Sequence, residues 1–278
     1  MKIGNREFDT KNECYIMGIL NVTPDSFSDG GLWNDPERAK RHTEDMIREG
    51  ASIIDIGGES TRPGHVQISE QEEIERVVPM IEMVKKNFDI PVSIDSYKSV
   101  VVEAALKAGA DLVNDIWGLK YDRHVADLIA RYQVPCCLMH NRKKAEYTRF
   151  LDEMCQDLKD SVAIAREAGV KEEQIILDPG VGFGKNYEHN LIAIQHLERL
   201  VELGYPVLLA TSRKSVIGLT LDLPADQRVE GTLVTTVFGV QKHAAFIRVH
   251  DVKENMRAIR MTQAIMRACA ADGDAPRA

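Results

Sequence analysis

Eight short apolar runs recur along the chain, and longer segments with a helical period lie between most of them. In residues 70–88 and 190–204, apolar side chains return every three or four positions, and Gly204 closes the second segment as a helix C-cap signal. Strands that alternate with helices predict a sheet of parallel strands. The runs are YIMGILNV, SIIDIGGE, PVSIDS, DLVNDIWG, PCCLMH, IILDPG, PVLLATS and AFIRVHD.

The fold class follows from the number and character of these runs. Eight nearly continuous apolar strands favour a closed (β/α)8 TIM barrel over an open doubly wound sheet, which stays the alternative because a sequence cannot show closure. The length of 278 residues suits one barrel domain over 1–278. The first residues, MKIGNREF, predict a short N-terminal strand or hairpin at the barrel floor, and we expect 269–278 to be a flexible polar tail.

Composition narrows the classes of partner. The net charge of −8 argues against nucleic acid or an anionic membrane, because both require a clustered basic surface. No signal peptide is evident and no run approaches the roughly 20 apolar residues that span a bilayer, so we expect a cytoplasmic protein. The five cysteines have no C-x-x-C spacing, which predicts neither a disulfide framework nor a zinc ribbon.

Polar residues follow every apolar run. In a barrel the carboxyl ends of the strands share one rim, where active sites of this fold are built. Asp95, Asn114 and Asp178 lie within or directly after apolar runs, where an uncompensated carboxylate is costly. The polar residues at the eight run ends are Asn21, Glu59 with Thr61 and Arg62, Asp95, Asn114, His140, Asp178, Ser212 with Lys214, and Arg248 with His250.

This set of side chains indicates a ligand. Two carboxylates and a carboxamide in a narrow mouth offer acceptors to a ring rich in N–H groups, such as an aminopyrimidinone. Lys214 and Arg248 add donors, and an arginine can also lie on a heteroaromatic face. Arg62, Arg213 and His250 suit phosphate or carboxylate. The rim therefore predicts a site for a ring with an anionic leaving group.

The glycine-rich segment DPGVGFGK, residues 178–185, is not a phosphate loop. Its spacing matches neither G-x-x-x-x-G-K-[ST] nor G-x-G-x-x-G. We interpret it as a tight loop after the sixth strand that places Phe183 near the mouth.

Seven motifs, in order over nearly the whole chain, resemble those of the dihydropteroate synthases in the pterin-binding barrel family. Such enzymes condense dihydropterin-methyl diphosphate with 4-aminobenzoate, and they release diphosphate as they form dihydropteroate. The motifs are ILNVTPDSFSDGG, DIGGESTRPG, SIDSYKSVV, VNDIWG, ILDPGVGFGK, TSRKSVIG and IRVHDV.

The resemblance assigns roles residue by residue. It implies Asp95, Asp178 and Lys214 as catalytic residues, Asn21 as a ligand of Mg²⁺, and Asp29 in a loop, residues 21–31, that closes over the site. The implied pterin site is Asp95, Asn114, Asp178, Lys214 and Arg248; the diphosphate site is Asn21, Thr61, Arg62, Arg248 and His250; the 4-aminobenzoate site is Phe27, Pro63, Phe183 and Ser212.

The implied chemistry is a dissociative substitution. An arylamine is already nucleophilic, so the leaving diphosphate needs the help, from magnesium and nearby cations. Asp95 and Asp178 would stabilise the cationic pterin-methyl group that forms as the C–O bond breaks.

The implied partners are these small-molecule substrates and a second copy of the chain. The helical segment VKENMRAIRMTQAIMRA could form a homodimer contact through Met256, Ile259, Met261, Ile265 and Met266, or pack on the barrel instead. The chain departs from the family pattern at Trp117 and in MHNRKKAEYT, at the outer wall of the site. Two alternatives remain: a methyltetrahydrofolate-corrinoid methyltransferase, and a pterin-binding homologue without catalysis.

Overall fold

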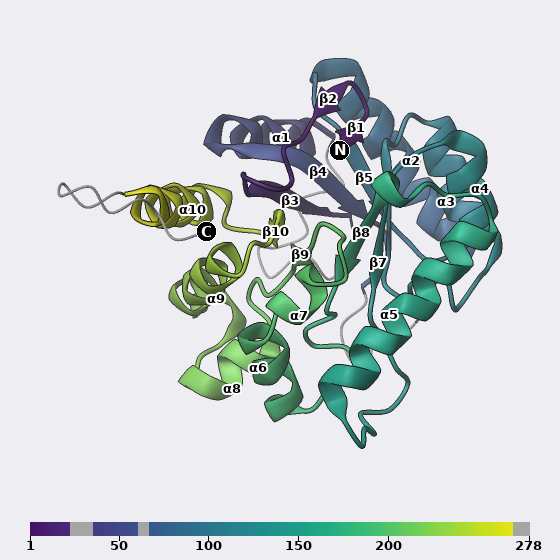
Figure 1. The fold of residues 1–278 in the computed structure, drawn as a ribbon. Helices are drawn as coiled ribbons and strands as arrows, with labels where there is room; N and C mark the ends of the chain where they lie inside the picture. Colours follow the sequence, from purple (N-terminus) through teal and green to yellow (C-terminus); the bar gives the residue numbers. More distant parts are fainter. Residues whose placement is uncertain (23–35, 61–66, 269–278) are drawn as a thin grey trace.

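Eight parallel strands form the centre of the molecule in a computed structural model of the chain (Figure 1). The structure describes residues 1–22, 36–60 and 67–268, and the expected tail at 269–278 lies outside these ranges. All eight predicted runs become strands. Their bounds are β3 (Tyr15–Asn21), β4 (Ala51–Gly57), β5 (Val92–Asp95), β6 (Leu112–Asp115), β7 (Cys136–Met139), β8 (Ile175–Asp178), β9 (Leu208–Leu209) and β10 (Phe246–Val249).

The strands close into a barrel. Their order is β8-β7-β6-β5-β4-β3-β10-β9, and a parallel bridge between Leu177 and Val207 joins the two ends of this order. The Leu177 amide also donates to the carbonyl oxygen of Pro206 at 2.9 Å. The predicted TIM barrel is confirmed, and the open sheet is excluded.

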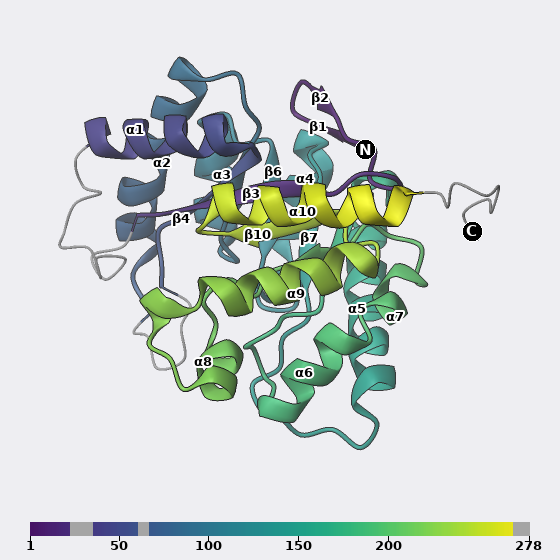
Figure 2. The same cartoon turned by 90° about the vertical axis from the view of Figure 1, so that its left-hand side faces the viewer.

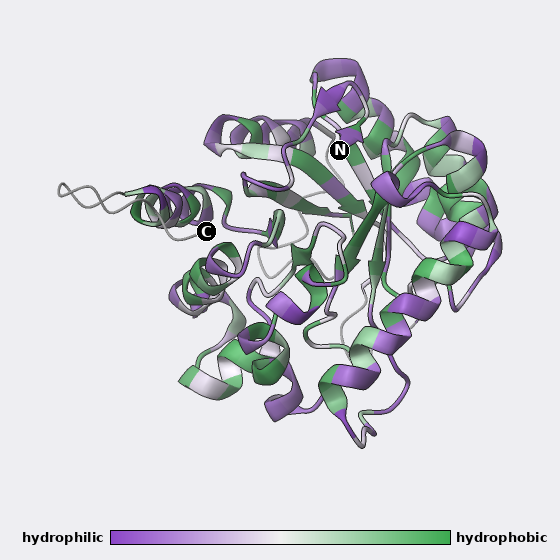
Figure 3. Cartoon of the chain, in the orientation of Figure 1, coloured by the Kyte–Doolittle hydropathy of each residue, from purple (hydrophilic) through white to green (hydrophobic). Residues whose placement is uncertain are grey.

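The helices lie outside the strands (Figures 1 and 2). Hydrophobic residues dominate the central strands, whereas the outer helices show many hydrophilic residues (Figure 3). The bounds are α1 (Pro36–Glu49), α2 (Glu70–Asn87), α3 (Ser99–Lys107), α4 (His124–Tyr132), α5 (Phe150–Glu167), η1 (Glu172–Gln174), α6 (Tyr187–Gln195), α7 (Glu198–Val201), α8 (Ser215–Leu221), η2 (Ala225–Gln227), α9 (Val229–Gln241) and α10 (Val252–Arg267).

One helix prediction needs correction. The segment 70–88 is helix α2, but 190–204 is not a single helix, because the backbone leaves the helical region at His196. A separate short helix, α7, follows, and Gly204 lies beyond it with a positive φ of 88°. The apolar period runs through both pieces, so it could not reveal the break between them.

The N-terminal hairpin closes the floor of the barrel. Strands β1 (Lys2–Ile3) and β2 (Arg6–Glu7) pair antiparallel, as expected from the first residues. Ile3 and Phe8 are buried in the apolar cluster that fills the barrel interior. The Phe8 ring lies 4.9 Å from that of Tyr15 and 5.8 Å from that of Phe246. A second, larger cluster fills the space between strands and helices.

The structure also bears on the membrane-spanning segments and the cysteines considered above. Within the described ranges, none of the helices has the length and apolar character needed to cross a membrane. Four cysteines are buried free thiols: Cys14, Cys136, Cys137 and Cys155. Cys269 lies outside the described residues.

The floor of the barrel supplies a stability prediction. Phe8→Ala removes a buried ring from the interior cluster, and such changes cost about 3 to 5 kcal/mol of unfolding free energy. Tyr121→Ala, at a ring that is 53% exposed, serves as control and should cost much less. Urea denaturation measures both, and equal losses would show that the hairpin does not contribute to the core.

Candidate active site

The polar residues at the carboxyl ends of β4, β5 and β6 lie side by side. In the strand register Asp95 faces Gly57 on one neighbour and Asn114 on the other. Because side chains alternate along a strand, residues in one such row point to the same side of the sheet. The barrel therefore brings the carboxylate of Asp95 and the carboxamide of Asn114 to one level of its interior, as the sequence predicts.

Arg248 of β10 joins this row through two ion pairs. Its Nε donates to Asp55 Oδ2 at 2.6 Å, and its Nη2 donates to Asp95 Oδ2 at 2.7 Å. The Asp55 side chain is fully buried, and the other two are nearly so. Asn114 Nδ2 also lies 3.5 Å from Asp55 Oδ2. One guanidinium thus holds two carboxylates in place at the mouth.

Three buried oxygens, at the level of Asp95 and at the level two residues before it on β4 and β5, have no hydrogen-bond partner among the described residues. They are Asp55 Oδ1, Asp95 Oδ1 and Ser93 Oγ. A buried polar atom without a partner costs about 1 to 3 kcal/mol, so proteins seldom leave several of them together. Unpaired carboxylate oxygens beside a polar mouth indicate that a ligand supplies the missing N–H donors.

Burial controls the ionisation of this group. It raises the pKa of Asp95 to about 7, an effect that Arg248 opposes and Asp55 reinforces. Burial alone would lower the pKa of Arg248, but Asp55 and Asp95 outweigh it and raise that pKa above its ordinary value. The guanidinium is therefore a permanent cation, whereas Asp95 is within reach of protonation near neutral pH.

Asp178 and Lys214 lie on the opposite side of the mouth. The Asp178 carboxylate accepts from the Gly180 amide at 2.7 Å, and Lys214 Nζ donates to the Val181 carbonyl at 2.6 Å. Burial raises the pKa of Asp178 against the opposing charge of Lys214, and it lowers the pKa of Lys214 to about 8. Lys214 Nζ also lies 4.9 Å from the centre of the Phe183 ring. The glycine loop thus places Phe183 beside the lysine, as predicted.

Ser212 and His250 meet at the ends of β9 and β10. Ser212 Oγ lies 2.9 Å from His250 Nδ1, and it accepts from the His250 amide at 3.1 Å. Arg213, an expected anion ligand, instead donates through Nε to Asp251 at 3.0 Å. Ser212 and His250 are therefore brought together, while the guanidinium of Arg213 serves an internal ion pair.

Comparison with known proteins places the chain in a family. Residues 17–250 match the family described as "Pterin binding enzyme". The dihydropteroate synthase of Clostridium beijerinckii is 60% identical over 96% of this chain and 100% of its own length. The chain belongs to the pterin binding enzymes. Within them its relative is a transferase, a dihydropteroate synthase, and the resemblance seen in the sequence is confirmed.

Solved structures of pterin binding enzymes share the fold. A dihydropteroate synthase from Clostridium difficile, crystallised in the presence of pteroic acid, has a TM-score of 0.91 at 50% identity and covers 94% of this chain and 100% of its own. The enzyme from Xanthomonas albilineans with 4-aminobenzoic acid has a TM-score of 0.88 at 40% identity and covers 93% of this chain and 95% of its own.

Asn21, at the carboxyl end of β3, is the residue expected to bind Mg²⁺. A Cβ atom built on Gly57 would be 3.5 Å from Asn21 Oδ1 and 3.5 Å from Asp95 Oδ2, so the two side chains flank that glycine. Within the described ranges no group of three His, Cys, Asp or Glu residues could hold a metal by itself. Mg²⁺ commonly takes one or two protein oxygens with substrate phosphates and water, and Asn21 fits that arrangement.

Glu59 lies at the rim, but it serves a buried ion cluster. Lys98 Nζ donates to Glu59 at 2.6 Å and to Glu73 at 2.8 Å, and the Tyr97 hydroxyl donates to Glu59 at 2.6 Å. Asp55, in contrast, belongs to the mouth through its ion pair with Arg248, although sequence reasoning did not select it. The available signal was its place in the middle of an apolar run, the same signal that marked Asp95.

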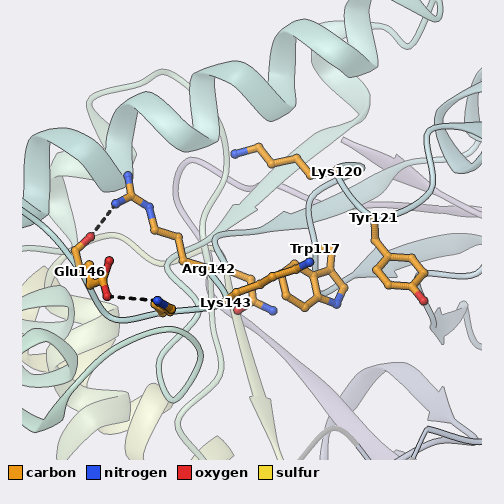
Figure 4. A pocket seen from close by; sticks show the side chains of 8 residues that line it. Trp117, Lys120, Tyr121, Arg142, Lys143 and Glu146 are labelled. Carbon is orange, nitrogen blue, oxygen red and sulfur yellow. Dashed lines mark hydrogen bonds and ion pairs between the residues drawn. The ribbon is translucent and has the colours of Figure 1, made fainter.

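The two places where the chain departs from the family pattern, Trp117 and the segment MHNRKKAEYT, line one cavity. Trp117 packs against the cluster of Tyr97, Ile116 and Met139. The cavity, of about 720 Å³, lies beside it, and Figure 4 shows side chains that line this cavity. Among them, Arg142 donates through Nε to Asp157 at 2.6 Å. The lining residues are Trp117, Lys120, Tyr121, Asn141, Arg142, Lys143, Lys144 and Glu146.

Five residues with expected roles lie outside the described residues: Phe27, Asp29, Thr61, Arg62 and Pro63. The expected closing loop, 21–31, lies outside them from residue 23 onward. Their roles stay predictions.

The ion pairs of Arg248 supply a second stability prediction. Arg248→Met leaves two carboxylates buried without a cation, and breaking a buried pair in this way costs about 3 to 5 kcal/mol. Arg199→Met removes an ion pair to Asp152 whose side chains are both 41% exposed, and it should cost at most about 1 kcal/mol. Chemical denaturation of both variants tests this, and similar losses would contradict the structural role of Arg248.

Proposed function

We propose that the chain joins dihydropterin-methyl diphosphate to 4-aminobenzoate, forming dihydropteroate and releasing diphosphate. The observation that carries the proposal is the set of unpaired buried oxygens at the barrel mouth, held beside Arg248. It is supported by the 60% identity to a dihydropteroate synthase and by the related structure that contains 4-aminobenzoic acid. We also propose that residues 1–278 act as one domain.

Recognition of the pterin ring would rest on acceptors from three strands. Asp95 Oδ1 has no partner among the described residues, and Asp178 uses Oδ1 for the Gly180 amide, which leaves its other oxygen for the ligand. Asn114, in register with Asp95, can both donate and accept. An aminopyrimidinone ring supplies the N–H groups that these oxygens need.

The cations would act on the other face and edge of the ring. Lys214 is placed to donate to a ring acceptor. Burial lowers its pKa to about 8, but the carboxylates of Asp178 and Asp95 oppose that shift and favour the charged form near neutral pH. Arg248 presents a planar group at the same level, so it can lie against the ring while it keeps its carboxylate partners.

The diphosphate would lie toward the ends of β9, β10 and β3. We assign it to His250 and Arg248, with Thr61 and Arg62 from outside the described residues. Asn21 would hold Mg²⁺ there together with diphosphate oxygens. When bound, the ion supplies positive charge to the departing diphosphate.

We infer a dissociative substitution. The C–O bond to the diphosphate breaks first, and the carboxylates of Asp95 and Asp178 stabilise the positive pterin-methyl group in a site of low dielectric. The arylamine nitrogen then forms the C–N bond and loses a proton. Phe183 and Ser212 would form the aminobenzoate wall, joined by Phe27 and Pro63 from outside the described residues, and Asp29 would belong to the closing loop.

The direct test of this function is a diphosphate assay. Protein, Mg²⁺ and both substrates should release diphosphate and form dihydropteroate. Methyl transfer from methyltetrahydrofolate without diphosphate release would support the corrinoid methyltransferase instead. Pterin binding with no turnover would identify a homologue without catalysis, and either result would overturn the proposal.

The carboxylates supply a binding prediction. Asp95→Asn and Asp178→Asn should each weaken binding of hydroxymethyl-dihydropterin by about 1.5 to 3 kcal/mol, because each loses a charge-assisted hydrogen bond. Asp45→Asn, at a carboxylate that is half exposed on α1, is the matched control and should bind normally. Calorimetry measures the three affinities, and unchanged binding in both site variants would refute the assignment.

The pH dependence of the same binding is a further prediction. Since burial raises the pKa of Asp95 to about 7, the free protein takes up a proton there below that pH. The ligand needs the ionised acceptor, so wild-type affinity should fall as the pH drops from 8 to 6. In Asp95→Asn this slope should become shallower, and an unchanged slope would assign the titration to another group.

The homodimer would use helices α9 and α10, which lie side by side (Figure 2). Of the α10 residues expected at the dimer contact, two face the barrel instead: Ile259 is buried, and Met256 packs on the core. Ile265 and Met261 are 63% and 62% exposed, and Met266 is also exposed. On α9, Val234 and Phe238 are exposed as well. A second copy of the chain would cover this apolar strip.

Glutamate substitutions in the exposed apolar strip of α9 and α10 test the proposed homodimer. A Met261→Glu, Ile265→Glu double variant should sediment as a monomer at concentrations where the wild type is a dimer, because it would bury two unpaired carboxylates. Val100→Glu, on the exposed side of α3, should leave the dimer intact. A dimer that survives the double variant would place the interface elsewhere.

A further inference from the structure

The glycine loop between β8 and α6 lies directly against the segment that follows β7. Gly180 and Gly184 have positive φ values of 67° and 55°. A Cβ atom on Gly180 would clash with the His140 carbonyl oxygen, and one on Gly184 would clash with the backbone of Arg142. The Tyr147 hydroxyl donates to the Gly184 carbonyl at 2.6 Å. The loop therefore rests backbone to backbone on its neighbour.

Lys185 closes this loop on itself. Its Nζ donates to the carbonyl oxygens of Gly180 at 2.9 Å and of Phe183 at 3.0 Å, and to His140 Nδ1 at 2.7 Å. An ammonium group has three N–H donors, so these acceptors use all of them. No role was assigned to Lys185 in the site described above, and sequence reasoning, which compared only the glycine spacing with phosphate loops, did not select it.

The third contact anchors the loop to α5. His140 Nδ1 accepts from Lys185, which requires the proton on Nε2, and Nε2 lies 3.1 Å from Asp157 Oδ2. Burial lowers the pKa of His140 to about 4, so the ring is neutral and can accept at Nδ1 while it donates at Nε2. Asp157 also accepts from Arg142. A continuous chain of hydrogen bonds thus runs from the glycine loop to the outer helix.

Two residues of the proposed site depend on the same loop. Asp178 precedes it and accepts from the Gly180 amide, while Phe183 lies inside it and contacts Lys214. Lys185 binds the carbonyl groups of both Gly180 and Phe183. The Lys185 side chain therefore links the backbone of Phe183 to that of Gly180, the residue whose amide binds Asp178.

We propose that Lys185 is a positioning residue for the 4-aminobenzoate site, which acts by fixing the Phe183 backbone and does not contact substrate. The inference rests on the proposed function, since it takes Phe183 as part of the aminobenzoate wall. It assigns the loop lysine a specificity role for the second substrate.

A role for Lys185 as a general base fits the structure less well. Burial lowers its pKa to about 7, a property that often marks catalytic lysines. The charged groups that influence this pKa are Asp178, Lys214, Asp157 and Arg142. The three donors of the ammonium group are directed at protein acceptors. In its charged form Lys185 therefore has no donor left for the reacting amine.

The test is a double-mutant cycle with Phe183. Lys185→Met should raise the KM for 4-aminobenzoate about 10-fold, because small displacements of a binding wall have effects of that order. The Kd for hydroxymethyl-dihydropterin should change much less. Phe183→Ala should raise the same KM, and the double variant should resemble Phe183→Ala alone, since residues that act as a unit are not additive.

Two further variants serve as references. Lys107→Met removes an exposed lysine of α3 that pairs with Glu103 at 3.2 Å, and it should leave the KM unchanged. Lys185→Arg keeps a cation and should recover part of the affinity for 4-aminobenzoate. It also carries the test if Lys185→Met does not fold.

The outcomes separate the two proposals. Unchanged KM in the Lys185 variants, or effects of Lys185 and Phe183 that multiply, would overturn the positioning role while wild-type turnover leaves the function intact. A wild type that releases no diphosphate from the two substrates would overturn the proposed function itself, before any variant is made.

Discussion

The guanidinium of Arg248 lies between the carboxylates of Asp55 and Asp95, and the rest of the mouth depends on that pair of contacts. Two carboxylates in an apolar barrel are tolerated only with a nearby cation, since burying an isolated charge is far more costly than any gain from packing. The single positive charge of the guanidinium balances one of the two carboxylate charges, so one negative charge remains. The remaining acceptors, Asp55 Oδ1 and Asp95 Oδ1, are thereby kept available in a place from which water is largely removed. Such a site favours a ligand that brings N–H groups and positive character.

The other half of the mouth is organised by backbone. Lys214 and Lys185 bind carbonyl groups of the glycine loop from two sides, and Gly180 and Gly184 allow it to lie against the segment after β7. Strands fix Asp95 and Asn114 through their register, whereas the backbone of Phe183 belongs to the loop, where Lys185 binds its carbonyl group. This difference in support explains why the two substrates of the proposed reaction would respond to different mutations. The pterin side depends on the barrel, and the aminobenzoate side depends on the lysines.

Sequence reasoning succeeded where a local pattern has one structural meaning. Asp95, Asn114 and Asp178 could be identified because each interrupts or ends a run that is otherwise apolar, and the eight runs themselves predicted the barrel. Asp55 carries the same signal, but the polar residues after Gly58 drew attention to Glu59, whose partners Lys98 and Tyr97 come from distant positions. Lys185 was hidden for a related reason: its three acceptors are defined by the folded loop and by His140, 45 residues away. The break at His196 could not be predicted, because the apolar period continues through it.

The central claim is that the unpaired oxygens of the mouth are the acceptors for a pterin ring. The most direct measurement is a crystal structure of the protein with hydroxymethyl-dihydropterin bound. The account predicts ring N–H groups within roughly 2.7 to 3.2 Å of Asp95 Oδ1 and of the Asp178 carboxylate. A ring bound elsewhere, with Asp95 Oδ1 still lacking a donor, would contradict it.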